Sequence, residues 1–184
     1  MYNKYRVLRE AKLKDKQTNK SKKEVIRMEN NNVIANSTVN AINNTEGRER
    51  GIACIRLAMG TAASMASGAL LITNPISGKF MMDDYNLTML AFFVHAVGED
   101  IGHAEDYGVM WGVDEDTTKS IITQEIGKTM KDLNKTGNNL AAILREKWRI
   151  KTIEELDKIE QALSILEDID NLYDEMNSKY SFSV

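Results

Sequence analysis

Two histidines and two carboxylates recur at helical spacing near the middle of the chain. His95, Glu99, His103 and Asp106 are separated by four, four and three residues. On one continuous helix they share a stripe, because each residue advances by about 100°. Imidazole and carboxylate ligands suit Zn²⁺, Mn²⁺ or Fe²⁺, and helix bundles build such sites from inward-facing side chains. A divalent-metal site, and with it a metalloenzyme, is therefore one hypothesis.

The same pattern also fits a polar helix face with structural histidines. One helix cannot encircle an ion, so further ligands would have to come from elsewhere, such as Asp83, Asp84 and the cluster at 114–116. The spacing differs from the Glu-x-x-His motif of di-iron bundles and from the His-Glu-x-x-His motif of zinc proteases. The metal hypothesis also requires that the helix continues through Gly98.

Other catalytic arrangements are missing from the sequence. No glycine-rich phosphate loop follows a predicted strand, and no Ser–His–Asp or Cys–His set can be assembled. The single cysteine, Cys54, lies in an apolar run, where a buried and inert thiol is expected. One cysteine also excludes a disulfide within the chain. These observations favour a protein that is not an enzyme.

Charge is distributed unevenly along the chain. Residues 1–27 hold ten Lys or Arg against three acidic residues, a net charge of +7, whereas residues 80–118 hold nine carboxylates and no Lys or Arg. Such a division predicts partners of opposite charge. The basic arm is expected to bind nucleic acid, another anionic partner or the acidic surface of a copy through Lys12, Lys14, Lys16, Lys20, Lys22, Lys23 and Arg27. A solvated tail is the simpler alternative.

The expected boundary between arm and body falls near residue 50. Residues 1–49 combine the basic arm with an asparagine-rich stretch, seven asparagines between 30 and 44, which is typical of a linker. Residues 50–184 have the length of one helical domain. No apolar core follows the early basic residues as it does in a secretory signal, so a cytoplasmic protein is expected.

A segment rich in small apolar residues, 51–73, gives the first strong helix signal. Ala58, Ala62 and Ala66 repeat at four-residue steps, a spacing that lets helices approach closely. A helix that is apolar all round is buried in a core or in a membrane. We predict a buried central helix. A membrane anchor through residues 52–76 is the alternative, because the uncharged run 57–78 is long enough to cross a bilayer.

Apolar residues at steps of three and four predict the remaining helices. We expect one helix from 85 to about 97 or onward to 107, one from the capping cluster at 114–118 to about 133, and a short one from 138 after a stop at 134–137. Thr152 and Glu155 form a capping box that opens a long final helix. Alternating strand patterns are absent, so the predicted fold is an all-α bundle of about five helices with a basic N-terminal arm.

The final helix carries a long apolar stripe with charges elsewhere, which is typical of a helical hairpin or a coiled-coil seam. We expect self-association through Leu156, Ile159, Leu163, Leu166 and Tyr173. The leading hypothesis is a helical interaction protein that self-associates and binds macromolecular partners through its basic arm and its acidic segment. Head-to-tail pairing of opposite charges suits an assembly component of viral or mobile-element origin. The alternatives are a metal-binding protein and a membrane-anchored one.

Overall fold

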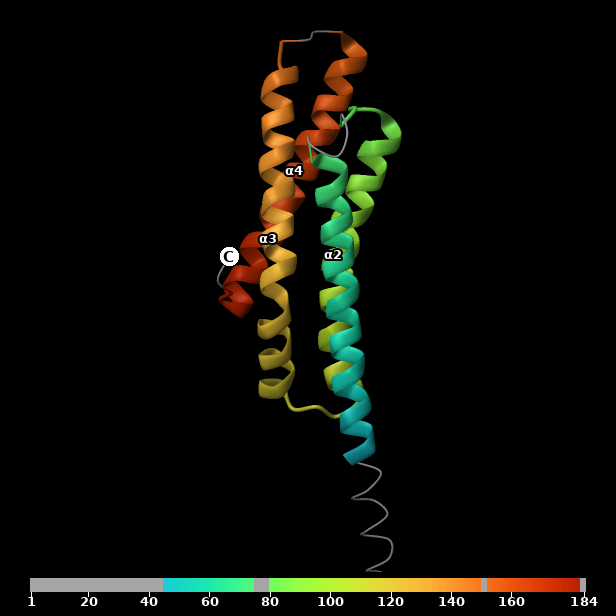
Figure 1. The fold of residues 1–184 in the computed structure, drawn as a ribbon, viewed down its shortest axis with the longest axis vertical. Coiled ribbons are helices and arrows are strands. Elements are labelled where there is room, and N and C mark those ends of the chain that lie inside the picture. The colour runs from blue at the N-terminus through green and yellow to red at the C-terminus, as the bar shows by residue number, and fades with distance from the viewer. Residues whose placement is uncertain (1–44, 75–79, 150–151, 183–184) are drawn as a thin grey trace, which may run out of the picture. The chain divides into compact units, whose positions relative to one another are not determined.

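A computed structural model describes residues 45–74, 80–149 and 152–182, and four helices account for most of them (Figure 1). The first helix is described over Thr45–Thr73. It is followed by α2 (Asp84–Met110), α3 (Glu115–Lys147) and α4 (Ile153–Tyr180). These ranges contain no strand, so the predicted all-α class is confirmed for them. The basic arm, residues 1–27, lies outside the described residues.

The bundle has four described helices and not about five, because α3 does not end near residue 134. The Thr136 hydroxyl donates to the carbonyl oxygen of Asp132 at 2.9 Å within an uninterrupted helix. Gly137 is buried, and a Cβ at this position would lie 3.2 Å from Cγ2 of Ile169 in α4. This glycine therefore permits close packing of two helices. The expected stop at 134–137 and the separate short helix from 138 are wrong.

The second helix also continues past a glycine. It runs through Gly98 as far as Met110, so the longer of the two expected alternatives is the one observed. The turn that follows contains Gly112, whose φ of +63° lies in the left-handed region that favours glycine. This short turn places α3 directly beside α2.

Side chains cap the N-terminal ends of the three later helices. Asp83 accepts a hydrogen bond from the backbone N–H of Asn86 at 2.8 Å, which caps α2. Asp114 accepts from the backbone N–H of Thr117 at 2.8 Å, which caps α3. In α4, both hydrogen bonds of the capping box are present. Each cap satisfies an N–H group that the helix itself leaves unpaired.

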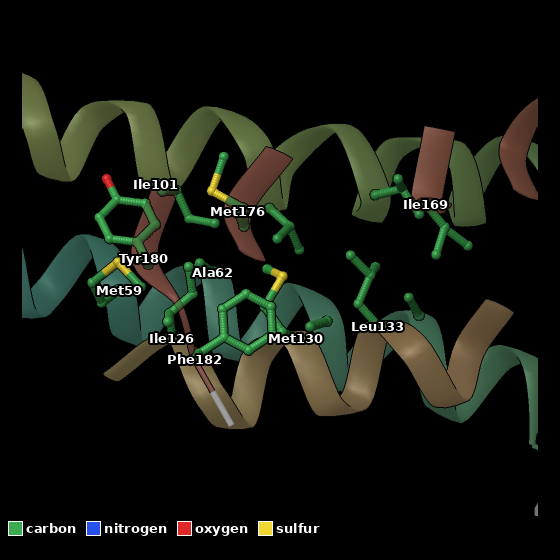
Figure 2. Close-up of a cluster of buried hydrophobic side chains, with 14 of the residues drawn as sticks. Met59, Ala62, Ile101, Ile126, Met130, Leu133, Ile169, Met176, Tyr180 and Phe182 are labelled. Carbon is green, nitrogen blue, oxygen red and sulfur yellow. The ribbon is translucent and has the colours of Figure 1, made fainter. Parts of the chain in front are cut away.

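The core draws buried side chains from all four helices (Figure 2). They include Met59 and Ala62 from the first helix, Ile101 from α2, Ile126, Met130 and Leu133 from α3, and Ile169 and Met176 from α4. The chain turns back after α4, because Ser181 adopts a left-handed conformation with φ of 50°. Phe182 is thereby buried, with its ring centroid 5.4 Å from that of Tyr173.

The first helix is buried on one face and exposed on the other. Its alanine repeat faces the core, and Ala58, Ala62 and Ala66 are all buried. On the opposite face Leu57 is 72% exposed and Leu71 is 64% exposed. Only 33% of its most apolar stretch is buried in the structure. The expected central helix, buried all round, is therefore not what the structure contains.

The Asp114 cap of α3 makes the free energy of unfolding depend on pH at acidic values. Hydrogen bonds from the Thr117 hydroxyl and backbone N–H, with a further one from Arg48, lower the pKa of Asp114 to about 2. In the unfolded chain the pKa is about 3.9. The stabilisation that ionised Asp114 gives the folded protein is therefore complete above about pH 4, and it is lost as the pH falls toward 2.

We expect Asp114→Asn, which keeps a capping oxygen but removes the charge, to show a shallower loss of stability between about pH 4 and 2. Urea unfolding midpoints at several pH values check this. Parallel pH profiles for the two proteins would contradict it.

Candidate functional site

The four residues of the metal hypothesis lie on one helix, α2, but do not converge on one point. His95 Nε2 is 3.7 Å from Glu99 Oε1, whereas His103 Nδ1 is 4.0 Å from Asp100 Oδ1. Both histidine side chains are largely exposed, and Asp106 is exposed as well. Within the described part of the chain, no three His, Cys, Asp or Glu side chains gather as a metal-ligand set. The geometry therefore gives the metal hypothesis no ligand cluster.

Asp100, which the spacing argument omitted, is the most buried carboxylate of this group. Its side chain is 20% exposed. Burial raises its pKa, His103 nearby lowers it, and the charge of Glu99 raises it further. Partial burial near the packed face of α2 therefore disfavours the ionised form of this side chain.

A groove of about 400 Å³ runs between α2 and α4 on the side that carries His95 and Glu99. We call this the α2–α4 groove. Its exposed rim holds carboxylates from both helices: Glu99 and Glu105 from α2, and Asp168 and Glu175 from α4. Its floor is formed by the apolar side chains of Val94, Ile101, Leu172 and Met176. Such a groove suits a segment that carries both apolar and basic side chains.

The two helices that form this groove are strongly acidic. Helix α2 carries five carboxylates and no Lys or Arg, a net charge of −5. Helix α4 carries nine carboxylates against two lysines, a net charge of −7. The acidic surface predicted for residues 80–118 therefore extends to α4, which the sequence prediction did not include. A count of charges along the final helix would have found it.

A cluster of three side chains connects the C-terminal end of α4 to α2. The Tyr180 hydroxyl donates to the Glu105 carboxylate, and Lys179 Nζ lies 2.5 Å from the same carboxylate. Tyr180 is only 4% exposed, and burial raises its pKa, with the accepting Glu105 carboxylate raising it further. Glu105 and Lys179 also line a second hollow of about 450 Å³ beside Val113 and Thr118. The cluster closes one end of the α2–α4 groove.

We expect Tyr180→Phe to lower the free energy of unfolding by about 1.5–3 kcal/mol at neutral pH, because a hydrogen bond to a charged group is lost. The raised pKa means that the stabilisation is present below about pH 10 and is lost as the unfolded chain ionises above it. Urea unfolding on both sides of this pH checks the prediction. When the pH is raised above about 10, the free energy of unfolding should fall less for the variant than for the parent. An equal fall would contradict a stabilising hydrogen bond from Tyr180 to Glu105.

The apolar stripe predicted for self-association is divided between the core and the surface. Ile159 is buried, and Leu166 and Tyr173 pack partly buried against the core. Leu156 is 48% exposed and Leu163 is 42% exposed. Most of the stripe is therefore satisfied within the chain, which leaves two leucines of α4 for contacts outside it.

A further exposed apolar surface lies on the first helix. Its outer face consists of Ala53, Leu57, Gly60, Ser64 and Leu71, all exposed. The two hydroxyls along it are satisfied by their own helix, because Thr61 donates to the carbonyl oxygen of Leu57 and Ser64 to that of Gly60. Beside it, Phe93 of α2 packs against Gly68, and its neighbour Phe92 is 54% exposed. The outer face thus consists mostly of small and apolar residues, its two hydroxyls are bonded within their own helix, and exposed Arg56 lies at its edge.

The basic residues predicted to bind an anionic partner, 12–27, lie outside the described residues. Comparison with known proteins gives no match to a protein-family model, a curated protein or a solved structure. The outer face of the first helix and the α2–α4 groove are the two surfaces from which a function can be argued.

Proposed function

We propose that this protein is a non-enzymatic helical assembly protein that self-associates through the outer face of its first helix. The observation that carries the proposal is the exposure of an apolar helix. Leu57 and Leu71 project from it at 72% and 64% exposure. Removal of apolar surface from water is favourable by about 25 cal/mol per Å². Contiguous exposed apolar patches mark interaction sites in soluble proteins.

A second copy fits this face because small residues lie at its centre and leucines lie toward its ends. A Cβ at Gly60 would meet nothing within 4 Å, so the backbone is open to a neighbour. Small residues at helical spacing let two helices pack closely. From residue 53 to residue 71 the helix rises by about 27 Å. In a two-fold dimer each copy presents the same face to the other, so one outer face is sufficient.

Hydroxyl groups on the outer face do not oppose its burial. Both Thr61 and Ser64 already donate to carbonyl oxygens one turn earlier, at 3.1 and 3.0 Å. A buried hydroxyl without a partner would cost about 1–3 kcal/mol, and that cost is avoided here. Phe93 of α2, which packs against Gly68, borders the C-terminal half of this helix.

A membrane anchor through residues 52–76 is the second candidate function. Among the described helices, the first is the one that is long and apolar enough to cross a bilayer by length and composition. Its inner face, however, supplies fully buried core residues such as Ile55 and Met59. Ser67 also donates to Asp132 of α3 at 2.9 Å. Insertion would require this helix to leave the core, so we place self-association first.

The charged parts of the chain extend this proposal to other partners. The basic arm would bind nucleic acid or an acidic protein surface, and the acidic surface of α2 would bind a basic partner. Phosphate contacts release counterions, so binding of nucleic acid by the arm would weaken steeply as salt is raised. Binding that is insensitive to salt would argue against a role of the arm.

The proposal is tested by Leu57→Lys in the full-length protein. We expect this variant to dissociate at least tenfold more readily than the parent in sedimentation velocity, because a charge would be buried at the interface. Its fold should persist, since Leu57 is 72% exposed. Ser120→Lys, at an exposed position of α3, is the matched control and should behave as the parent. Unchanged association of Leu57→Lys, or carbonate-resistant membrane pelleting of the parent, would overturn the proposal.

A further inference from the structure

We infer that the α2–α4 groove binds the basic N-terminal segment, residues 1–27, of a neighbouring copy. The inference rests on the proposed self-association and gives it a second contact of a different kind. The outer face of the first helix would provide an apolar contact, and the groove would provide a charged one. The two contacts respond differently to salt, so each can be tested without the other.

The carboxylates of the groove rim are only partly neutralised within the described part of the chain. Glu99 is 57% exposed, and its partner is His95, an ion pair only when the imidazole is protonated. Asp168 and Glu175 on the opposite side of the groove are exposed and form no ion pair with another described residue. Lys179 is engaged with Glu105. The rim therefore offers several carboxylates to incoming Lys or Arg side chains.

Two glycines of α2 leave the wall of the groove open to a neighbouring chain. Gly98 and Gly102 lie one turn apart within α2, and both line the groove. A Cβ at Gly98 would make an ordinary contact of 3.6 Å with Leu172, and a Cβ at Gly102 would meet nothing within 4 Å. A glycine within a helix costs about 0.5–1 kcal/mol relative to alanine. Packing among the described residues requires neither glycine, whereas close approach of another chain would explain both.

The composition of the basic N-terminal segment matches the groove. Residues 1–27 hold ten basic side chains, and these are interleaved with apolar ones: Tyr2, Tyr5, Val7, Leu8, Leu13, Val25 and Ile26. The groove has the matching order, with carboxylates on the rim and apolar side chains on the floor. Complementary charge both steers association and fixes its register. Pairing of the basic arm of one copy with the acidic groove of the next would reduce the repulsion between like charges within each surface.

The test mixes two full-length variants, each built on Leu57→Lys so that the apolar contact is weakened. One carries Lys12→Glu, Lys14→Glu and Lys16→Glu, which leaves its groove intact. The other carries Glu99→Lys, Asp168→Lys and Glu175→Lys at exposed positions, which leaves its arm intact. Fluorescence anisotropy of one labelled variant is followed as the other is added.

We expect the mixture to pair at low salt at least tenfold more tightly than either variant pairs with itself, and to separate in about 0.5 M salt. No pairing in the mixture would overturn the inference. Self-pairing of either variant as strong as that of the mixture would overturn it too. Mixed pairing together with unchanged association of Leu57→Lys alone would support the groove and reject the proposed apolar contact.

A further variant separates the groove from a diffuse attraction between opposite charges. Gly102→Leu, added to the variant with the intact groove, is expected to weaken the mixed pairing at least tenfold, because the side chain fills the open wall. Gly47→Leu is the matched control, since a Cβ at Gly47 also meets nothing within 4 Å and the residue does not line the groove. Equal pairing with Gly102→Leu and Gly47→Leu would overturn the assignment to the groove.

Discussion

Replacing Ile169 by alanine is expected to lower the free energy of unfolding by about 2–5 kcal/mol, the range for truncation of a buried aliphatic side chain. Ile169 is 1% exposed and lies between α4 and α3, against Gly137 (Figure 2). The glycine opposite it has no side chain that could move into the space. Truncation therefore leaves a cavity at a close contact between the two helices. Urea unfolding followed by circular dichroism measures the loss.

Leu163→Ala in the same helix is the control for this prediction. Leu163 is 42% exposed, so its truncation should change the free energy of unfolding by no more than about 0.5 kcal/mol. Both variants shorten an aliphatic side chain of α4, and only one of the two opens the core. Equal losses for the two variants would contradict the division of the α4 stripe between core and surface.

Gly108→Ala is expected to cost about 1–3 kcal/mol, although alanine favours a helix more than glycine does. A Cβ at Gly108 would lie 2.4 Å from Oγ1 and 2.8 Å from Cγ2 of Thr118. Both atoms belong to a buried side chain at the start of α3, close to the short turn that joins it to α2. The two helices would have to separate at this point. The same unfolding measurement gives the loss.

A second substitution tests whether Thr118 is the cause. The Thr118 hydroxyl is buried without a hydrogen-bond partner among the described residues, so Thr118→Ala alone should cost little. Combined with Gly108→Ala it removes both clashing atoms and should restore most of the lost stability. Additive losses in the double variant would show that the two positions do not interact, contrary to the geometry.

The helices themselves could be predicted from local patterns. A run of small apolar residues located the first helix, and apolar spacing of three and four residues located α2, α4 and both halves of α3. The capping residues located the starts of α3 and α4 at Asp114 and Thr152. Such signals depend on neighbours in the sequence and need no knowledge of the fold. Helix breaks were predicted less well. Gly137 resembles a stop in the sequence, yet it is a contact point between helices, which only the partner Ile169 reveals.

The surfaces could be predicted only in part. The small-residue pattern of the first helix indicated burial, but it does not tell how many faces are covered. Ala62 faces the core and Gly60 faces outward, two residues apart in the same run. The acidic character of residues 80–118 was plain in the sequence, whereas its continuation across the groove onto Asp168 and Glu175 depends on how α4 packs against α2. Pairing of distant helices is a property of the fold.

The measurement that tests the central claim most directly is the mass of the unmodified full-length protein in solution. Sedimentation velocity across a wide dilution series, without detergent and at low and high salt, distinguishes the possibilities. We predict a discrete oligomer larger than the 20.8 kDa chain, which dissociates on dilution and persists in part at high salt through the apolar outer face. A particle of 20.8 kDa at every concentration and salt level would contradict the account.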